Sequence, residues 1–238
     1  MLLSLLLQIT SPAIDSAAKA TTAVTETIAP IQDSLSLLDL MMKGGYIMIP
    51  IGILSILSIY VLIERYITIK KASKIDDNFM NNVRDFILQG NIDSAKSICK
   101  NAQHPVGKMI EKGIVRIGKP MKEIEGSMEA VGKIEIGKLE KNTGILGIIA
   151  GIAPMFGFIG TISGVIKIFY KISLADNISI GLISGGLYEK MITSAAGLVV
   201  GVFAFVGYHW LNMLIDKLSF KMEISSMEFI DMLQEPSK

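Results

Sequence analysis

Three long runs without a charged residue constrain this chain more than any other feature of its sequence. They are Tyr46–Ile63, Asn142–Ile166 and Met191–Ile215, with 18, 25 and 25 residues. A helix needs about 20 apolar residues to cross a hydrocarbon core about 30 Å thick. Each run also contains glycine or proline, which membrane helices tolerate better than soluble helix interiors do. The sequence therefore predicts an all-α membrane protein with three transmembrane helices.

The composition agrees with this prediction and argues against several other classes of protein. Of the 238 residues 50% are hydrophobic and only 19% are charged, against roughly 25% charged in soluble domains. The net charge of +1 gives no reason to expect a nucleic-acid partner. A single cysteine, Cys99, and two histidines form no metal-binding pattern, so no cofactor is expected. No phosphate-binding loop or catalytic series is present either, which argues against an enzyme.

The basic residues predict the orientation of the helices. Residues 67–141 contain 14 lysines and arginines, whereas residues 1–45 contain two and residues 168–187 contain one. Loops rich in lysine and arginine remain in the cytoplasm, so we expect 67–141 and the C-terminus inside and the N-terminus outside. The expected divisions are an external N-terminal segment with an amphipathic helix (1–45), transmembrane helix 1 (46–66), a cytoplasmic helical domain (67–141), transmembrane helix 2 (142–167), a short external loop (168–187), transmembrane helix 3 (188–216) and a cytoplasmic tail (217–238).

The N-terminal segment allows two interpretations. Its apolar beginning, Met1–Leu7, is followed by small residues, but it is short and no basic residue precedes it, so it fits a signal peptide poorly. The amphipathic stretch Leu35–Met42 favours an external helix that lies on the membrane surface.

The cytoplasmic segment has the pattern of a helical hairpin. Two apolar stripes with helical spacing flank the turn signal Gly90-Asn91. They consist of Phe79, Val83, Phe86 and Ile87 before the turn, and of Ile92, Ala95, Ile98 and Cys99 after it. The stretch from Met121 to Lys141 is expected to continue into transmembrane helix 2 as one unbroken helix.

Small residues recur at three- and four-residue spacing in the last two transmembrane helices. They let a neighbouring backbone approach closely, and tight packing alone explains most of them. The candidate packing positions are Gly157, Gly160, Gly164, Gly197 and Gly201.

Three hydroxyl residues in the same helices are candidates for a proton path. Thr161 lies about 28 Å along its helix from Asn142, and Thr193 and Ser194 lie near the outer start of the antiparallel third helix. We therefore expect them at similar depth, with Glu189 one turn before Thr193, as a ladder of proton-exchanging groups. The alternative is that each hydroxyl bonds the carbonyl four residues earlier in its own helix.

The remaining charges near the membrane have less distinctive patterns. Glu64 and Arg65 follow the first run directly, and a solvated anchor pair is the default interpretation. Lys190 is placed to compensate Glu189, which could face an interior cavity. Lys167 and Lys171 are expected to extend towards the outer interface.

These residues lie within a resemblance to the MotA/TolQ/ExbB proton-channel family, and to its ExbB/TolQ branch in particular. The resemblance covers about residues 40–220, and the segments that carry it are PIGILSILSIYVLIERY, IAGIAPMFGFIGTISGVI and EKMITSAAGLVVGVFAF. The middle segment is the most specific, with Ala153-Pro154 followed by Gly157 and by Gly160-Thr161-x-x-Gly164. Three spans with the N-terminus outside also fit this branch, because MotA-like proteins have four.

The resemblance implies a pentameric ring in the bacterial inner membrane, with the N-terminus in the periplasm. Spans two and three would line the pore, span one would lie outside, and an ExbD/TolR-like single-span partner would occupy the pore. A TonB-like protein would carry the force to outer-membrane transporters. The lumen-facing residues of the family correspond to Thr161, Glu189 and Ser194, with Thr193 as a substitute for Ser194. Phe203 stands where the family has a proline, which makes a kink there doubtful.

Two alternatives remain open at this point. One is a TolQ-like motor for envelope integrity or surface motility. The other is a non-conducting membrane scaffold whose polar residues only pack.

Overall fold

The structure is a computed structural model that describes residues 45–76, 78–174 and 180–234. The expected amphipathic helix of the N-terminal segment lies outside the described residues, as does part of the loop between the last two spans. Every regular element in the described ranges is an α-helix. The helices are α3 (Met48–Ala72), α4 (Phe79–Leu88), α5 (Ile92–Asn101), α6 (Pro105–Val115), α7 (Met121–Glu140), α8 (Thr143–Ser173) and α9 (Ile180–Gln234).

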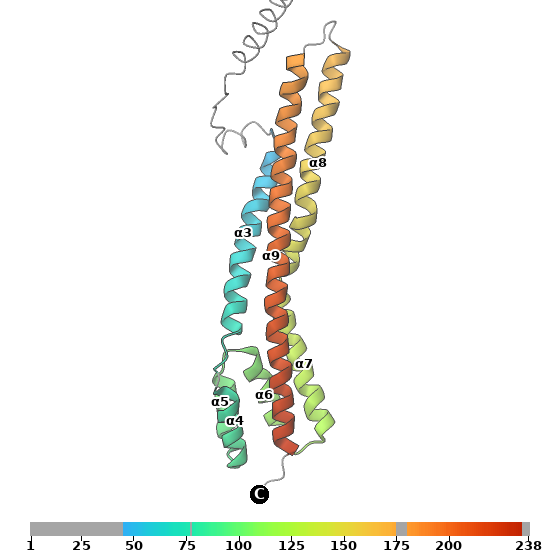
Figure 1. The fold of residues 1–238 in the computed structure, drawn as a ribbon. Helices are drawn as coiled ribbons and strands as arrows, with labels where there is room; N and C mark the ends of the chain where they lie inside the picture. The colour runs from blue at the N-terminus through green and yellow to red at the C-terminus, as the bar shows by residue number, and fades with distance from the viewer. Residues whose placement is uncertain (1–44, 77, 175–179, 235–238) are drawn as a thin grey trace, which may run out of the picture. The chain divides into compact units, whose positions relative to one another are not determined.

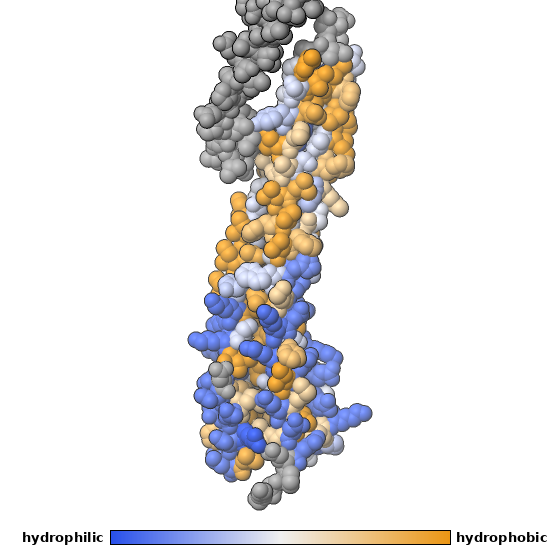
Figure 2. All heavy atoms as spheres, viewed as in Figure 1, coloured by the Kyte–Doolittle hydropathy of each residue, from blue (hydrophilic) through white to orange (hydrophobic). Residues whose placement is uncertain are grey.

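The prediction of three transmembrane helices is confirmed. Within the described residues, α3, α8 and α9 are the helices long and apolar enough to cross a membrane. Figure 2 shows hydrophobic side chains along the part formed by α3, α8 and the first half of α9, and hydrophilic ones over the part formed by α4–α7. We call α3, α8 and residues 180–216 of α9 the apolar part. We call α4–α7 together with residues 217–234 of α9 the polar region.

Helix α9 connects the apolar part to the polar region without interruption. It contains 55 residues, about 82 Å at 1.5 Å per residue, which is far longer than a hydrocarbon core. It runs beside α8 and α3 in the apolar part and beside α7 and α6 in the polar region (Figure 1). Its C-terminal part contributes Leu218, Met222 and Phe229, each at most 2% exposed, to the core of the polar region.

The predicted helical hairpin is confirmed as α4 and α5. Gly90 closes the turn with a positive φ of 73°, a backbone conformation that glycine adopts without steric cost. Asn91 then caps α5, since its side chain accepts a hydrogen bond from the Ser94 amide at 3.3 Å. Val83, Ala95 and Cys99 from the two stripes are fully buried.

The expectation of one unbroken helix from Met121 into the second span is wrong. Helix α7 ends at Glu140 and α8 begins at Thr143. Between them Lys141 is extended, and Asn142 has a left-handed φ of 69°, which asparagine tolerates better than most residues. The two helices are therefore joined by a tight, defined junction.

Candidate functional site

Helices α8 and α9 pack closely in antiparallel directions, and the five candidate glycines lie at their contact. A Cβ atom built on Gly157 would lie 3.0 Å from the Ser194 carbonyl oxygen, and one on Gly160 would lie 2.8 Å from Cγ2 of Thr193. One on Gly197 would lie 2.6 Å from the Ala153 carbonyl oxygen. Ordinary carbon contacts are about 3.5–4.0 Å, so a larger residue at these positions would force the helices apart.

The proline of α8 fits against a glycine of α9. Pro154 lies inside α8 and has no amide hydrogen to donate to the carbonyl of Ala150. A Cβ on Gly201 would lie 2.5 Å from Cγ of Pro154 and 3.1 Å from that carbonyl oxygen. Glycine at 201 therefore leaves the room that the proline ring needs.

The same contact places the predicted hydroxyl residues at similar positions along the α8–α9 pair. Oγ1 of Thr161 lies 3.3 Å from the Gly157 carbonyl of its own helix and 3.4 Å from the Lys190 carbonyl of α9. Thr193 is fully buried, and it faces Gly160, the neighbour of Thr161. The Thr161 hydroxyl can therefore donate to the carbonyl four residues earlier, as the alternative interpretation expected, or across to a backbone carbonyl of α9. The ladder of proton-exchanging side chains stays a prediction.

The structure describes the side chain of Ser194 but only the backbone of Glu189. Ser194 is half-buried, and its backbone lies against Gly157. Glu189 belongs to the helical backbone of α9, one turn before Thr193, but its side chain lies outside the described residues.

Three lysines lie at the end of the α8–α9 contact next to Thr161. The side chain of Lys190 lies across Gly164, where a Cβ would be 1.9 Å from Cγ of the lysine. Lys167 and Lys171 line the same hollow of about 340 Å³. The Lys167 ammonium lies 5.3 Å from the ring centre of Tyr46, a distance at which a cation is attracted by the ring face. Among the described side chains, three lysines therefore gather at this end of the helix pair.

The pair at the other end of the apolar part is not the solvated anchor expected from sequence. Arg65 is only 8% exposed. Its guanidinium donates to the Lys141 carbonyl at 2.8 Å and pairs with the carboxylate of Glu64. The interpretation as a solvated pair is wrong for Arg65 because this side chain satisfies a carbonyl left unpaired where α7 ends. Arg65 therefore fixes the α7–α8 junction to α3.

Two polar groups that are buried in the structure were not predicted from the sequence. Ser58 on α3 is fully buried, and its hydroxyl has no hydrogen-bond partner among the described residues. Glu135 on α7 is also buried and bonds two lysines. The i, i+3 spacing of Glu135 and Lys138 was the only available signal for the second group.

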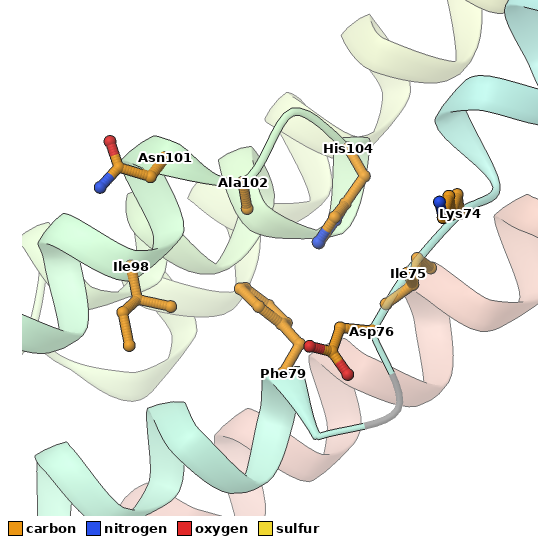
Figure 3. A pocket seen from close by; sticks show the side chains of 8 residues that line it. All are labelled: Lys74, Ile75, Asp76, Phe79, Ile98, Asn101, Ala102 and His104. Atoms are coloured by element: carbon orange, nitrogen blue, oxygen red, sulfur yellow. The ribbon is translucent and has the colours of Figure 1, made fainter.

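A separate cleft of about 670 Å³ lies in the polar region (Figure 3). Phe79 and His104 meet there edge to face, with ring centres 4.7 Å apart. Nδ1 of His104 accepts a hydrogen bond from the Gly107 amide at 3.1 Å and so caps α6. Burial lowers the pKa of His104, which favours the neutral imidazole that this cap requires. The cleft contains none of the predicted proton-path residues.

Helix α9 shows no break at Phe203. It is helical throughout Ile180–Gln234, and Phe203 is 46% exposed on its apolar surface. The helix is therefore continuous at the position where the sequence made a kink doubtful.

Comparisons with known proteins agree with this architecture. Residues 101–224, which contain both α8 and most of α9, match the model of the MotA/TolQ/ExbB proton channel family. A Synechocystis protein named as an ExbB-like biopolymer transport protein is 28% identical over 180 residues, covering 74% of this chain and 70% of that protein. An ExbB homolog of Methanothermobacter thermautotrophicus is 27% identical over 191 residues, covering 79% of this chain and 67% of that protein.

A member of the Tol branch is similar as well. The Tol-Pal system protein TolQ of Haemophilus influenzae is 28% identical over 98 residues, covering 40% of this chain and 43% of that protein. Together with the ExbB-like relatives, it supports the ExbB/TolQ branch. The match to the family model extends over more than half of the sequence, and the chain therefore belongs to the MotA/TolQ/ExbB proton channel family.

Proposed function

We propose that this chain is the proton-channel subunit of an inner-membrane complex that converts the proton-motive force into movement. The observation that carries the proposal is the placement of Thr161, Thr193 and Ser194 at one level of the α8–α9 contact, within two long apolar helices. Hydroxyl groups at such positions form hydrogen bonds between membrane helices, and with the ionisable Glu189 nearby they would offer a series of proton-exchanging groups. Membership of a family of proton channels supports the same role.

The chemistry of Thr161 suits a proton path. Either of its two hydrogen bonds uses the hydroxyl proton as donor, and neither uses the lone pairs of the oxygen. The oxygen of Thr161 can therefore accept a hydrogen bond from water or from a carboxyl group while its hydroxyl hydrogen is donated to a carbonyl. Glu189, one turn before Thr193, would extend this path towards the end of α9.

Further helices beside α8 and α9 would complete such a pathway. Large apolar side chains remain exposed on α8 and α9, among them Phe158, Val199 and Phe205. We propose that five copies form a ring, with α8 and α9 around a pore and α3 outside. An ExbD-like single-span partner would occupy the pore and exchange protons through an aspartate. The polar region and the C-terminus would lie in the cytoplasm and the N-terminus in the periplasm.

The effector of this motor would be a TonB-like protein that energises outer-membrane transport. One charge that crosses 100 mV releases about 2.3 kcal/mol, so several protons can supply appreciable mechanical work. The similarity to TolQ favours one alternative effector, a Tol-type system for envelope integrity or surface motility.

Replacement of the hydroxyls in the chain's own complex tests the proposal. Thr161→Val combined with Ser194→Ala should abolish energy-dependent transport by cells that produce the complex at normal levels, and Glu189→Gln should impair it. Ser163→Ala, which removes a hydroxyl two residues along α8, is the matched control and should leave transport intact. Full transport by the double variant would contradict a proton path through these hydroxyls and leave the non-conducting scaffold as the alternative.

A further inference from the structure

A second polar site lies at the opposite end of the apolar part from the hydroxyl residues, where α3 meets α6 and α7. A cleft of about 420 Å³ opens there between the three helices. Its basic lining residues are Lys71 from α3, Lys108 from α6 and Lys138 from α7. Ile67, Ala72 and Leu139 provide an apolar part of the same lining. The cleft is thus amphiphilic, with ammonium groups beside apolar side chains.

Glu135 lines this cleft and holds two of its lysines in place. Its side chain is only 8% exposed, and its two oxygens bind Lys108 at 2.8 Å and Lys138 at 2.5 Å. Burial tends to raise the pKa of Glu135, but its bonds to the two lysines hold the pKa below its ordinary value. The carboxylate therefore remains charged and holds two lysines from different helices at the cleft. Because three lysines and one carboxylate line the cleft, the cleft has an excess of positive charge.

The position along α3 places the cleft at the membrane surface. The uncharged part of α3 ends at Ile63, and Lys71 lies eight residues further, about 12 Å along the helix. The headgroup layer adds roughly 5–8 Å on each side of the hydrocarbon core, and a lysine side chain extends several ångströms towards it. The exposed Ile67 lies midway along α3 between the end of the uncharged part and Lys71. The lysines of the cleft are therefore within reach of the headgroup layer if α3 spans the membrane over its uncharged part.

We propose that this cleft binds the phosphate headgroup of an anionic lipid from the leaflet next to the polar region. The three lysines would contact the phosphate, while Ile67, Ala72 and Leu139 contact the glycerol and the upper acyl chain. Basic pockets at this level of a membrane protein are suited to anionic lipids. Because α3 and α7 both line the cleft, a bound lipid would connect the first span to the helix that leads into the second.

The test compares lipid retention by the purified full-length chain in detergent, measured by native mass spectrometry. The probes are phosphatidylglycerol, phosphatidylcholine and inorganic phosphate at equal concentrations. Lys71→Gln removes a cleft lysine that has no ion pair among the described residues and leaves Glu135 with both partners. Lys122→Gln is the matched control, because this lysine is exposed at the far end of α7, about 24 Å from Lys138.

We expect the wild type to retain phosphatidylglycerol in preference to phosphatidylcholine. Lys71→Gln should weaken this retention about fivefold, Lys71→Arg should preserve it, and Lys122→Gln should change it less than twofold. The melting temperatures of the variants establish that each remains folded. The proposal is overturned if Lys71→Gln retains the lipid like the wild type, if Lys122→Gln weakens retention equally, or if phosphatidylcholine is retained as well. It is also overturned if inorganic phosphate displaces the lipid, because the site would then bind a free anion.

Discussion

The close contact of α8 and α9 predicts a large effect of one added methyl group. In a Gly197→Ala variant the new Cβ would lie 2.6 Å from the Ala153 carbonyl oxygen and 3.0 Å from Cα of Gly157. Both are backbone atoms, so no side-chain rotation relieves the clash. Carbon contacts need about 3.5 Å or more, and the helices must separate by roughly 0.5–1 Å.

The magnitude follows from a balance of two effects. Overpacking of a tight contact costs about 1–3 kcal/mol, whereas replacing a helical glycine by alanine gains up to about 1 kcal/mol in helix propensity. Gly151→Ala is the matched control, because it adds a methyl group in the interior of α8 at a position with nothing within 4 Å. The difference in stability between the two variants therefore isolates the cost of the clash.

Thermal unfolding of the detergent-purified variants measures this difference. For a chain of this size about 1 kcal/mol corresponds to 2–4 °C, so Gly197→Ala should melt roughly 5 °C below Gly151→Ala. A Gly197→Ala variant that melts at or above the control would refute the close packing of α8 against α9.

Three further predictions concern the polar region and its junction with the membrane. Arg65→Lys should lower stability by about 1.5–3 kcal/mol in denaturant unfolding, because it disrupts buried charge-assisted hydrogen bonds, whereas Arg116→Lys in an exposed ion pair should cost less than about 1 kcal/mol. Burial lowers the pKa of His104, so stability should be complete above its unfolded pKa of about 6.5 and fall as the pH drops below that value. His104→Asn, which keeps a capping acceptor, should remove this part of the pH dependence of the melting temperature. Cys99 is fully buried with its pKa raised to about 12, and the native protein should therefore resist maleimide at pH 7 until it unfolds.

Each of these predictions has a contrary outcome. Equal losses in the two arginine variants would mean that Arg65 does not stabilise the α7–α8 junction. An unchanged slope of melting temperature against pH in His104→Asn would assign the acid sensitivity to other groups. Rapid labelling of Cys99 in the folded chain would show that the hairpin of α4 and α5 opens readily.

The sequence was sufficient for the features that depend on local pattern. The lengths of the uncharged runs predicted the three spans, and the apolar stripes on either side of Gly90 predicted the hairpin. Both signals come from residues within a few turns of each other, where helical periodicity relates spacing directly to burial.

The features that the sequence analysis missed depend on distant residues. The junction at Lys141 and Asn142 is held by Arg65, 76 residues earlier in the chain, and the helical pattern on either side gave no indication of a break. Glu135 is likewise held by Lys108, 27 residues away. A buried charge is retained only where such partners meet it, and only the packing of α3, α6 and α7 brings these partners together.

The central claim is that protons pass along the hydroxyl residues between α8 and α9. Its most direct test is proton influx into liposomes that contain this chain together with the proposed single-span partner, driven by an imposed membrane potential and followed with an internal pH dye. We expect Thr161→Val with Ser194→Ala to reduce the influx at least tenfold relative to wild type and to the Ser163→Ala control, with equal amounts of assembled complex. Influx at the wild-type rate in the double variant would contradict the account.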